Sequence, residues 1–97
     1  MSTEPSDLVR LTVWVEGFVQ GVGFRFFAER MASVEGIHGW VANRDDGAVE
    51  VFAEGEKAAV DRYAAKIRVG PPSARVDDVW TDDDVPSGQS GGFTVLS

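Results

Sequence analysis

One stretch of the chain has the composition of an anion-binding loop. Gly17, Gly21 and Gly23 lie between a run of alternating apolar residues and a run at helical spacing, and Arg25 follows soon after. Glycines let a chain curl so that successive backbone N–H groups point into one concavity. The start of a helix favours an anion, and an arginine in its first turn can close over that anion with a two-pronged contact. The stretch therefore indicates a site for one small phosphate group.

The same loop does not fit a nucleotide site. It lacks the Gly-Lys-Ser/Thr ending of a P-loop, and no acidic metal ligand stands beside it. A glycine-rich connection before a helix can also be nothing more than a tight turn. Taken without other information, the loop leaves these two interpretations evenly balanced.

Asn43 is a candidate for holding a water molecule. It has the strand parity of Ile37 and Val41, so its side chain is expected on the face of the sheet that the helices cover. It also stands near the end of its strand, where the glycine loop could come within reach. An amide donates and accepts hydrogen bonds, which suits a water held in line with a phosphorus atom. Asparagine is also common at hairpin turns, and this simpler interpretation is preferred if the loop is ignored.

The hydrophobic pattern predicts the elements that position these residues. Period-two alternation and short apolar runs predict strands, and apolar residues at helical spacing predict two amphipathic helices. An Asp-Gly turn joins two of the strands as a hairpin, and two prolines end the second helix. The predicted strands cover residues 8–16, 37–43, 48–53, 74–81 and 93–96, the predicted helices cover residues 24–35 and 55–69, and a polar loop covers residues 82–92.

This order of elements predicts an α+β fold. With right-handed crossovers, β-α-β-β-α-β gives the ferredoxin-like sandwich, a four-stranded antiparallel sheet with both helices on one face. The run at 93–96 leaves room for a short extra terminal strand. Residues 1–7 are predicted to form a disordered tail, and residues 8–97 a single domain.

Two motifs in order carry a family resemblance. The sequence GFVQGVGFR, followed by the Asn43 of GWVAN and then by DGAVE, resembles the acylphosphatase family. The later GPPSARV and the terminal Phe93 match at family spacing, so the resemblance spans roughly residues 8–96. Phe18 and Ala42 stand where the family often has basic residues, and Glu35 where a leucine often precedes the glycine. We expect Glu35 to face solvent at the end of its helix.

The resemblance implies hydrolysis of acyl phosphates to a carboxylate and inorganic phosphate, without a metal or cofactor. It implies that Arg25 binds the phosphate and that Asn43 positions the attacking water. It assigns no protein residue as general base, and the substrate's own phosphate is the candidate proton acceptor. Phosphate or sulfate should compete with the substrate. The backbone amides implied in phosphate binding are those of Val19, Gln20, Gly21, Val22, Gly23 and Phe24.

Composition limits the class of protein. The 97 residues, 43% hydrophobic, form one domain, and the absence of cysteine excludes disulfides and thiolate chemistry. The single histidine, His38, cannot supply the several ligands that zinc takes. A net charge of −7 repels nucleic acid and anionic lipid. With no apolar run for a signal peptide or a membrane span, we expect a cytoplasmic monomer with no nucleic-acid or membrane partner.

Other interpretations stay open at this stage. The fold also serves RNA-recognition domains, although the aromatic-basic signature of those domains is missing. A non-catalytic or carbamoyl-phosphate-binding acylphosphatase-like module, as in hydrogenase-maturation carbamoyltransferases, is the main alternative. We expect His38 to be a surface or hydrogen-bonded residue on the outer sheet face. The tryptophans Trp14, Trp40 and Trp80 are expected to pack on sheet faces, and Asp82–Asp84 to form a solvated loop.

Overall fold

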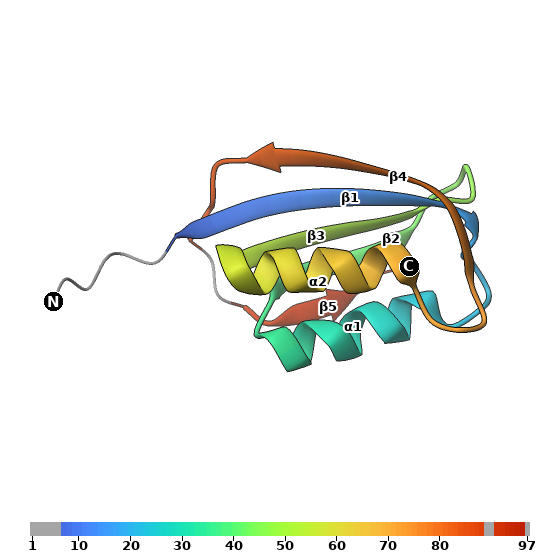
Figure 1. The fold of residues 1–97 in the computed structure, drawn as a ribbon, viewed down its shortest axis with the longest axis horizontal. Coiled ribbons are helices and arrows are strands. Elements are labelled where there is room, and N and C mark those ends of the chain that lie inside the picture. Colours follow the sequence, from blue (N-terminus) through green and yellow to red (C-terminus); the bar gives the residue numbers. More distant parts are fainter. Residues whose placement is uncertain (1–6, 89–90, 97) are drawn as a thin grey trace, which may run out of the picture.

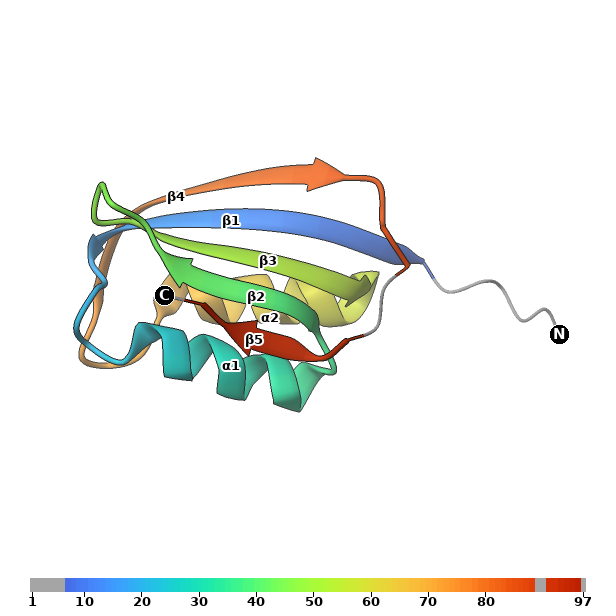
Figure 2. The ribbon, with the colours of Figure 1, turned by 180° about the vertical axis from the view of Figure 1, so that it is seen from behind.

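The computed structural model describes residues 7–88 and 91–96 of the chain. One sheet, with strand order β4-β1-β3-β2-β5, carries both helices on one face (Figure 1, Figure 2). The predicted ferredoxin-like α+β fold is confirmed. The elements are β1 (Leu8–Phe18), α1 (Phe24–Glu35), β2 (His38–Asn43), β3 (Val49–Glu56), α2 (Lys57–Val69), β4 (Arg75–Asp84) and β5 (Phe93–Val95).

The short terminal strand is present and makes the sheet mixed. β5 runs parallel to β2, with Phe93 opposite Gly39, whereas the other neighbouring strands are antiparallel. The predicted tail of residues 1–7 lies outside the described residues except for Asp7, whose carbonyl accepts a hydrogen bond from the Lys57 N–H at 2.8 Å. Within the described part of the chain, neither helix is long and apolar enough to cross a membrane.

Three strands are longer than predicted because backbone pairing continues where the side-chain pattern gives no signal. β1 runs to Phe18, which pairs with Arg75, and not to residue 16. β3 runs to Glu56, which pairs with Leu8, so the second helix begins at Lys57 and not at residue 55. β4 runs to Asp84, which lies opposite Arg10. Residues 82–84 are therefore part of an edge strand, and the prediction of a loop there is wrong. Their side chains are exposed, as predicted.

The core lies between the sheet and the helices. Val13 and Val15 of β1, which alternate with partly exposed neighbours, are fully buried. Tyr63 of α2 is also fully buried, and its hydroxyl donates a hydrogen bond to the Ala28 carbonyl of α1 at 2.9 Å. Burial raises the pKa of Tyr63, because the phenolate would lose its hydration. This contact joins the two helices across the core.

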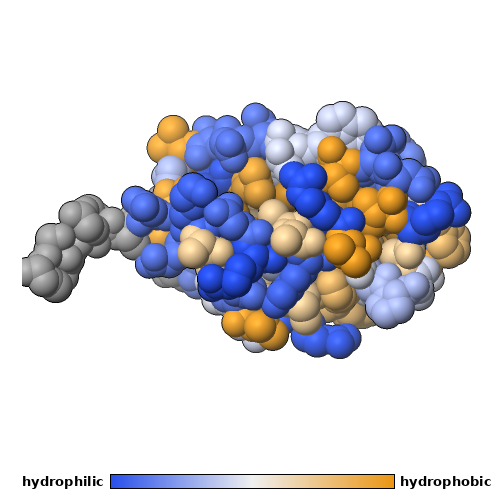
Figure 3. All heavy atoms as spheres, in the orientation of Figure 1, coloured by the Kyte–Doolittle hydropathy of each residue, from blue (hydrophilic) through white to orange (hydrophobic). Residues whose placement is uncertain are grey.

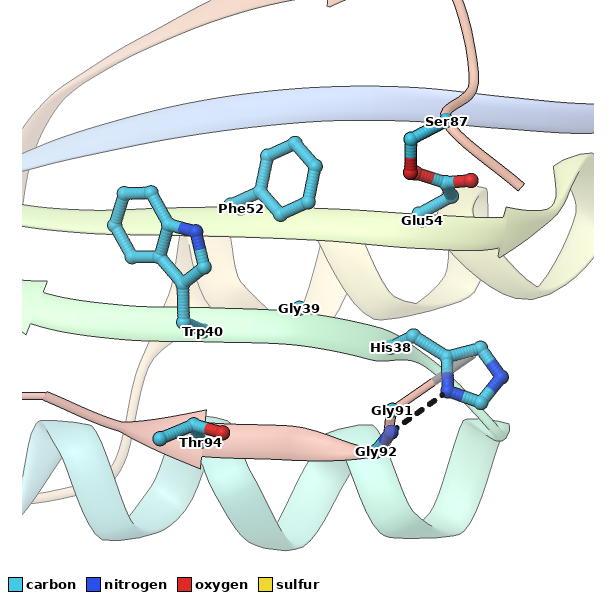
Figure 4. Close-up of a pocket in the computed structure, with 9 residues that line it drawn as sticks. All are labelled: His38, Gly39, Trp40, Phe52, Glu54, Ser87, Gly91, Gly92 and Thr94. Atoms are coloured by element: carbon cyan, nitrogen blue, oxygen red, sulfur yellow. Dashed lines mark hydrogen bonds between the residues drawn. The ribbon is translucent and has the colours of Figure 1, made fainter. Parts of the chain in front are cut away.

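The outer face of the sheet carries the aromatic residues that we expected there. Trp40 stacks on Phe52 with ring centroids 5.8 Å apart (Figure 4). The guanidinium of Arg10 lies 4.6 Å from the Phe52 centroid. Trp14 and Trp80 lie opposite each other on β1 and β4. These contacts confirm packing as the role of Trp40.

The connection between β4 and β5 is tied to this outer face. The Nδ1 atom of His38 accepts a hydrogen bond from the Gly92 N–H at 3.2 Å (Figure 4), so His38 is hydrogen-bonded, as predicted. Glu54 is only 3% exposed, and its carboxylate accepts hydrogen bonds from Ser87 Oγ at 2.8 Å and from the Gly88 N–H at 2.7 Å. Burial alone would raise the pKa of Glu54, but these hydrogen bonds and the charge of Arg10 together hold it below its usual value.

Glu35 does not face solvent, and that prediction is wrong. Its side chain is 8% exposed and receives Arg62 Nε and Lys66 Nζ of α2, each at 2.8 Å. The hydrogen bonds from Lys66 and Arg62 hold the pKa of the Glu35 carboxyl below its usual value. The carboxylate thus clamps the end of α1 to the neighbouring helix, a contact that the sequence of either helix alone cannot show.

We predict that the free energy of unfolding of Glu35→Gln depends less on pH than that of the wild type. A carboxyl whose pKa is lowered on folding stabilises the fold above its ordinary pKa of 4.5 and loses this contribution as the pH falls through the lower folded value. The urea midpoint of the wild type should therefore exceed that of Glu35→Gln at pH 7, and the two should converge below pH ~4. Glu29→Gln, at an exposed position of α1, is the matched control. A difference that is constant from pH 7 to pH 3 would contradict the prediction.

Candidate active site

The loop between β1 and α1 leaves the start of the helix without a side-chain cap. Gly23 occupies the N-cap position with φ 80° and ψ 17°, a left-handed conformation that favours glycine. No side chain of the described residues caps the first N–H groups of α1. Such unpaired N–H groups, at the positive end of a helix, are the groups that an anion would bind.

A cavity of about 240 Å³ lies beside this helix start. Arg25 and Asn43, which are 18 positions apart in the sequence, both line it. The other lining residues come from the loop and the first helical turn: Val19, Gly21, Gly23, Phe24 and Phe26. The structure therefore brings together the two side chains that the sequence singled out.

The six residues whose amides were candidates divide into two groups. Four of them, Val19, Gly21, Gly23 and Phe24, line the cavity, whereas Gln20 and Val22 do not. Phe26 lines the cavity but was not among the predicted residues. The sequence signal that could have identified Phe26 is its position. It directly follows Arg25 and lies outside the apolar stripe of the predicted helix.

Asn43 reaches the cavity because of strand parity. Val41 of β2 is fully buried under the helices, and Asn43, two residues later and at the end of the strand, lies on the same face. Its side chain makes no hydrogen bond to any other described residue. The amide is thus available to a ligand or a water molecule.

Gln20 fastens the loop to the β2–β3 hairpin. Its side-chain Nε2 donates to the carbonyls of Arg44 at 2.8 Å and of Ala48 at 3.0 Å. Arg44 follows Asn43 directly, so these two bonds fix the distance between the loop and the Asn43 wall of the cavity. Sequence reasoning assigned only a backbone amide to Gln20 and missed this side-chain contact.

The turn before β4 supports the loop from another side. Ser73 Oγ donates to the Val22 carbonyl at 2.7 Å. Phe24, 2% exposed, packs over Gly70, where an added Cβ would lie 2.8 Å from its ring. Gly17, at a break in the β1–β4 register, approaches β4 so closely that a Cβ would lie 2.2 Å from the Arg75 carbonyl. Neither glycine can take a side chain without moving this turn.

Arg25 is the one charged residue among the described residues that line the cavity. Its Nη1 donates to the Leu96 carbonyl, just beyond β5, at 3.0 Å. A guanidinium has five N–H groups, and among the described residues Leu96 is its only hydrogen-bond partner. The bond orients the side chain and leaves donors for an anion. Arg25 thus supplies local positive charge in a chain of net charge −7.

A second, shallower cavity adjoins the first at Asn43. It has a volume of about 370 Å³, and its other lining residues are Arg44, Asp45 and Asp46 of the hairpin turn. The Nη1 atom of Arg44 pairs with Glu50 at 2.7 Å, and Asp46 Oδ1 accepts a hydrogen bond from the Ala48 N–H at 3.0 Å. Among the residues that the structure describes, no group of three or more histidine and acidic side chains could hold a metal ion.

The acylphosphatase family model matches residues 11–95. The chain belongs to the acylphosphatase family. An acylphosphatase of Thermotoga petrophila is 45% identical over 85 residues, which cover 88% of this chain and 93% of the relative. The crystal structure of an acylphosphatase from Bacillus subtilis superposes with a TM-score of 0.87 at 34% identity, covering 92% of this chain and 99% of that one. An acylphosphatase structure from Coxiella burnetii gives 0.88 at 32% identity, covering 99% and 100%.

We predict that inorganic phosphate stabilises the fold by binding in this cavity. A ligand that binds only the folded state adds about 2.7 kcal/mol to the free energy of unfolding at a hundredfold excess over its dissociation constant. The melting temperature should therefore rise with phosphate when ionic strength is held constant with chloride. Arg25→Ala should largely abolish the rise. An equal rise in the wild type and in Arg25→Ala would place the bound phosphate elsewhere.

Proposed function

We propose that this chain hydrolyses acyl phosphates to a carboxylate and inorganic phosphate. One observation carries the proposal: Arg25 and Asn43 line a single cavity beside the uncapped start of a helix. Such a cavity offers helix N–H groups and a guanidinium to an anion, together with an amide that can hold water. Membership of the acylphosphatase family supports the same activity.

In the proposed complex the phosphate group lies against the loop. The N–H groups of residues 19–24 donate to its oxygens, foremost those of Val19, Gly21, Gly23 and Phe24, which line the cavity. Arg25 adds its remaining donors. Hydrogen bonds to a charged group contribute roughly 1.5–3 kcal/mol each, so a few of them hold a phosphate against the negative charge of the chain.

The reaction requires orientation of the water and the substrate more than general acid or base catalysis. The water held by Asn43 attacks phosphorus in line with the acyl oxygen, the bond between phosphorus and that oxygen breaks, and its electron pair leaves on the carboxylate. A carboxylate is a good leaving group and requires no protonation. Among the residues that the structure describes, no histidine, lysine or carboxylate lines the cavity, so a phosphoryl oxygen of the substrate accepts the proton of the water. Arg25 and the amides stabilise the charge that spreads over the phosphoryl oxygens.

We also propose that the chain acts as a cytoplasmic monomer on small molecules, without nucleic-acid or membrane partners. The net charge of −7 supports the absence of nucleic-acid and membrane partners, because it repels both nucleic acid and anionic lipid.

Release of phosphate from benzoyl phosphate tests the proposed activity and separates it from a binding module. The purified chain should release one phosphate and one benzoate per substrate at a rate far above spontaneous hydrolysis. A protein that binds phosphate, by calorimetry, without accelerating this reaction would instead be the non-catalytic module considered from the sequence.

We predict different defects for the two side chains. Arg25→Ala should raise KM and lower kcat, because the guanidinium contacts the phosphate in the ground state and in the transition state. Asn43→Ala should lower kcat by on the order of 10²–10³, the usual loss for one oriented donor, while phosphate still binds. Calorimetric phosphate affinity measured beside turnover checks both. Loss of phosphate binding in Asn43→Ala would show that the roles are wrongly assigned.

Arg25→Lys is the matched control for charge. A lysine keeps the positive charge but not the planar, two-pronged contact, so this variant should recover little of the lost activity. Recovery to near the wild-type rate would mean that charge alone suffices.

We predict that turnover is independent of divalent metal. The cavity is lined by one arginine, one asparagine and apolar or glycine residues, none of which is a preferred ligand of zinc or magnesium. Dialysis against a strong chelator should leave kcat/KM for benzoyl phosphate unchanged. A loss of activity that added zinc or magnesium restores would refute the metal-free mechanism.

A further inference from the structure

Phe26 is the lining residue that phosphate binding does not explain. It lines the cavity beside Arg25, yet it is 63% exposed. A residue that both lines a cavity and is largely exposed lies at its mouth. Gly21 and Gly23 are the other exposed lining residues, so among the described residues Phe26 alone presents an exposed side chain at the mouth.

Further apolar side chains surround this end of the molecule. The β1–α1 loop, the β2–β3 hairpin and the end of α2 lie together there (Figure 1). Figure 3, in the same orientation, shows hydrophobic residues gathered toward that end on the face that carries the helices. Hydrophobic residues at the ends of three elements are exposed: Phe18 of β1 at 56%, Val69 of α2 at 74% and Leu96, just beyond β5, at 44%. This end of the molecule therefore offers apolar surface to an acyl group.

The opposite side of the site carries negative charge. Asp45 and Asp46 line the adjoining cavity that shares Asn43. The positive charge of Arg44 in that cavity is already compensated by Glu50 at 2.7 Å. An acyl group with its own negative charge would find no free cation on this side.

The in-line geometry of the proposed reaction directs the acyl group away from these acids. The leaving oxygen must lie on the side of phosphorus opposite the attacking water. If Asn43 holds the water, the acyl group points away from Asn43 and the hairpin. The remaining walls of the cavity belong to the loop and the first turn of α1, where Phe26 is the exposed side chain.

We propose that Phe26 determines substrate specificity by contacting the acyl group, and that the site prefers acyl phosphates whose acyl group is apolar and uncharged. The proposal rests on the proposed acyl phosphate hydrolysis and names the class of substrate for it. An aromatic ring favours an apolar or aromatic partner through ring contact and removal of water from both surfaces. The benefit should appear in kcat/KM, since the contact forms with the substrate and persists in the transition state.

The test compares three substrates in four proteins. Benzoyl phosphate carries an aromatic acyl group, acetyl phosphate a minimal one and succinyl phosphate an anionic one. The wild type should prefer them in that order. Phe26→Ala should lower the benzoyl-to-acetyl ratio of kcat/KM by about 3- to 10-fold, the effect expected for loss of one ring contact. Phe26→Leu, which keeps an apolar surface, should lie between Phe26→Ala and the wild type.

Val34→Ala is the matched control. Val34 lies on the same helix and is 64% exposed, close to the 63% of Phe26, but it does not line the cavity, so its removal should leave the substrate ratio unchanged. The inhibition constant of inorganic phosphate should also be unchanged in Phe26→Ala, because phosphate has no acyl group to contact.

Two results would overturn the inference. An equal loss of kcat/KM on benzoyl and acetyl phosphate in Phe26→Ala, with weaker inhibition by phosphate, would mean that Phe26 only supports the phosphate loop. A wild-type preference for succinyl phosphate would show that the site accepts anionic acyl groups. Both leave the proposed function intact, whereas a wild-type chain that hydrolyses none of the three substrates would remove the proposed function and this inference together.

Discussion

The side-chain amide of Gln20 holds the two halves of the site together. A loop that offers its backbone N–H groups to an anion cannot use them to hold itself in place, and its glycines contribute no side chains for packing. The support must come from outside: Gln20 bonds the hairpin, Ser73 bonds the Val22 carbonyl, and Phe24 packs over Gly70. The position of Arg25 relative to Asn43 follows from these contacts. Support of a loop by its neighbours, more than the loop sequence alone, distinguishes an anion site from a tight turn.

The fold and the position of Asn43 were predictable because they depend on periodicities that burial imposes on the sequence. The alternation of apolar and polar residues along β1 predicted which face of that strand is buried. In β2, the parity that Asn43 shares with Val41 predicted that Asn43 lies on the face under the helices. The strand ends at Glu56 and Asp84 were not predictable, because backbone pairing with β1 extends them regardless of side chain. The ion pairs of Glu35 were missed for a related reason: their partners stand 27 and 31 positions away, and no local pattern links them.

The cavity itself was predicted only in part. The family resemblance implied Arg25 and the amides of residues 19–24, but it could not tell which of these residues face inward, and Gln20 and Val22 do not line the cavity. It also gave no role to Phe26. The periodic pattern of hydrophobic residues identifies side chains that face the core, and an exposed aromatic residue is not part of that pattern. A surface side chain that contacts a ligand is selected for that contact. The sequence of the protein alone carries little information about the ligand.

The bond between Arg25 and the Leu96 carbonyl has a consequence for how the site is made. It joins residues 71 positions apart, from the first helix to the segment after the last strand. During synthesis the first four strands and both helices leave the ribosome before Leu96 does, and they can begin to assemble without it. Until Leu96 follows, the guanidinium of Arg25 is without its carbonyl partner and is not yet oriented. Completion of the cavity is thus tied to a residue translated 71 positions after Arg25, and closing so distant a contact is an intrinsically slow step.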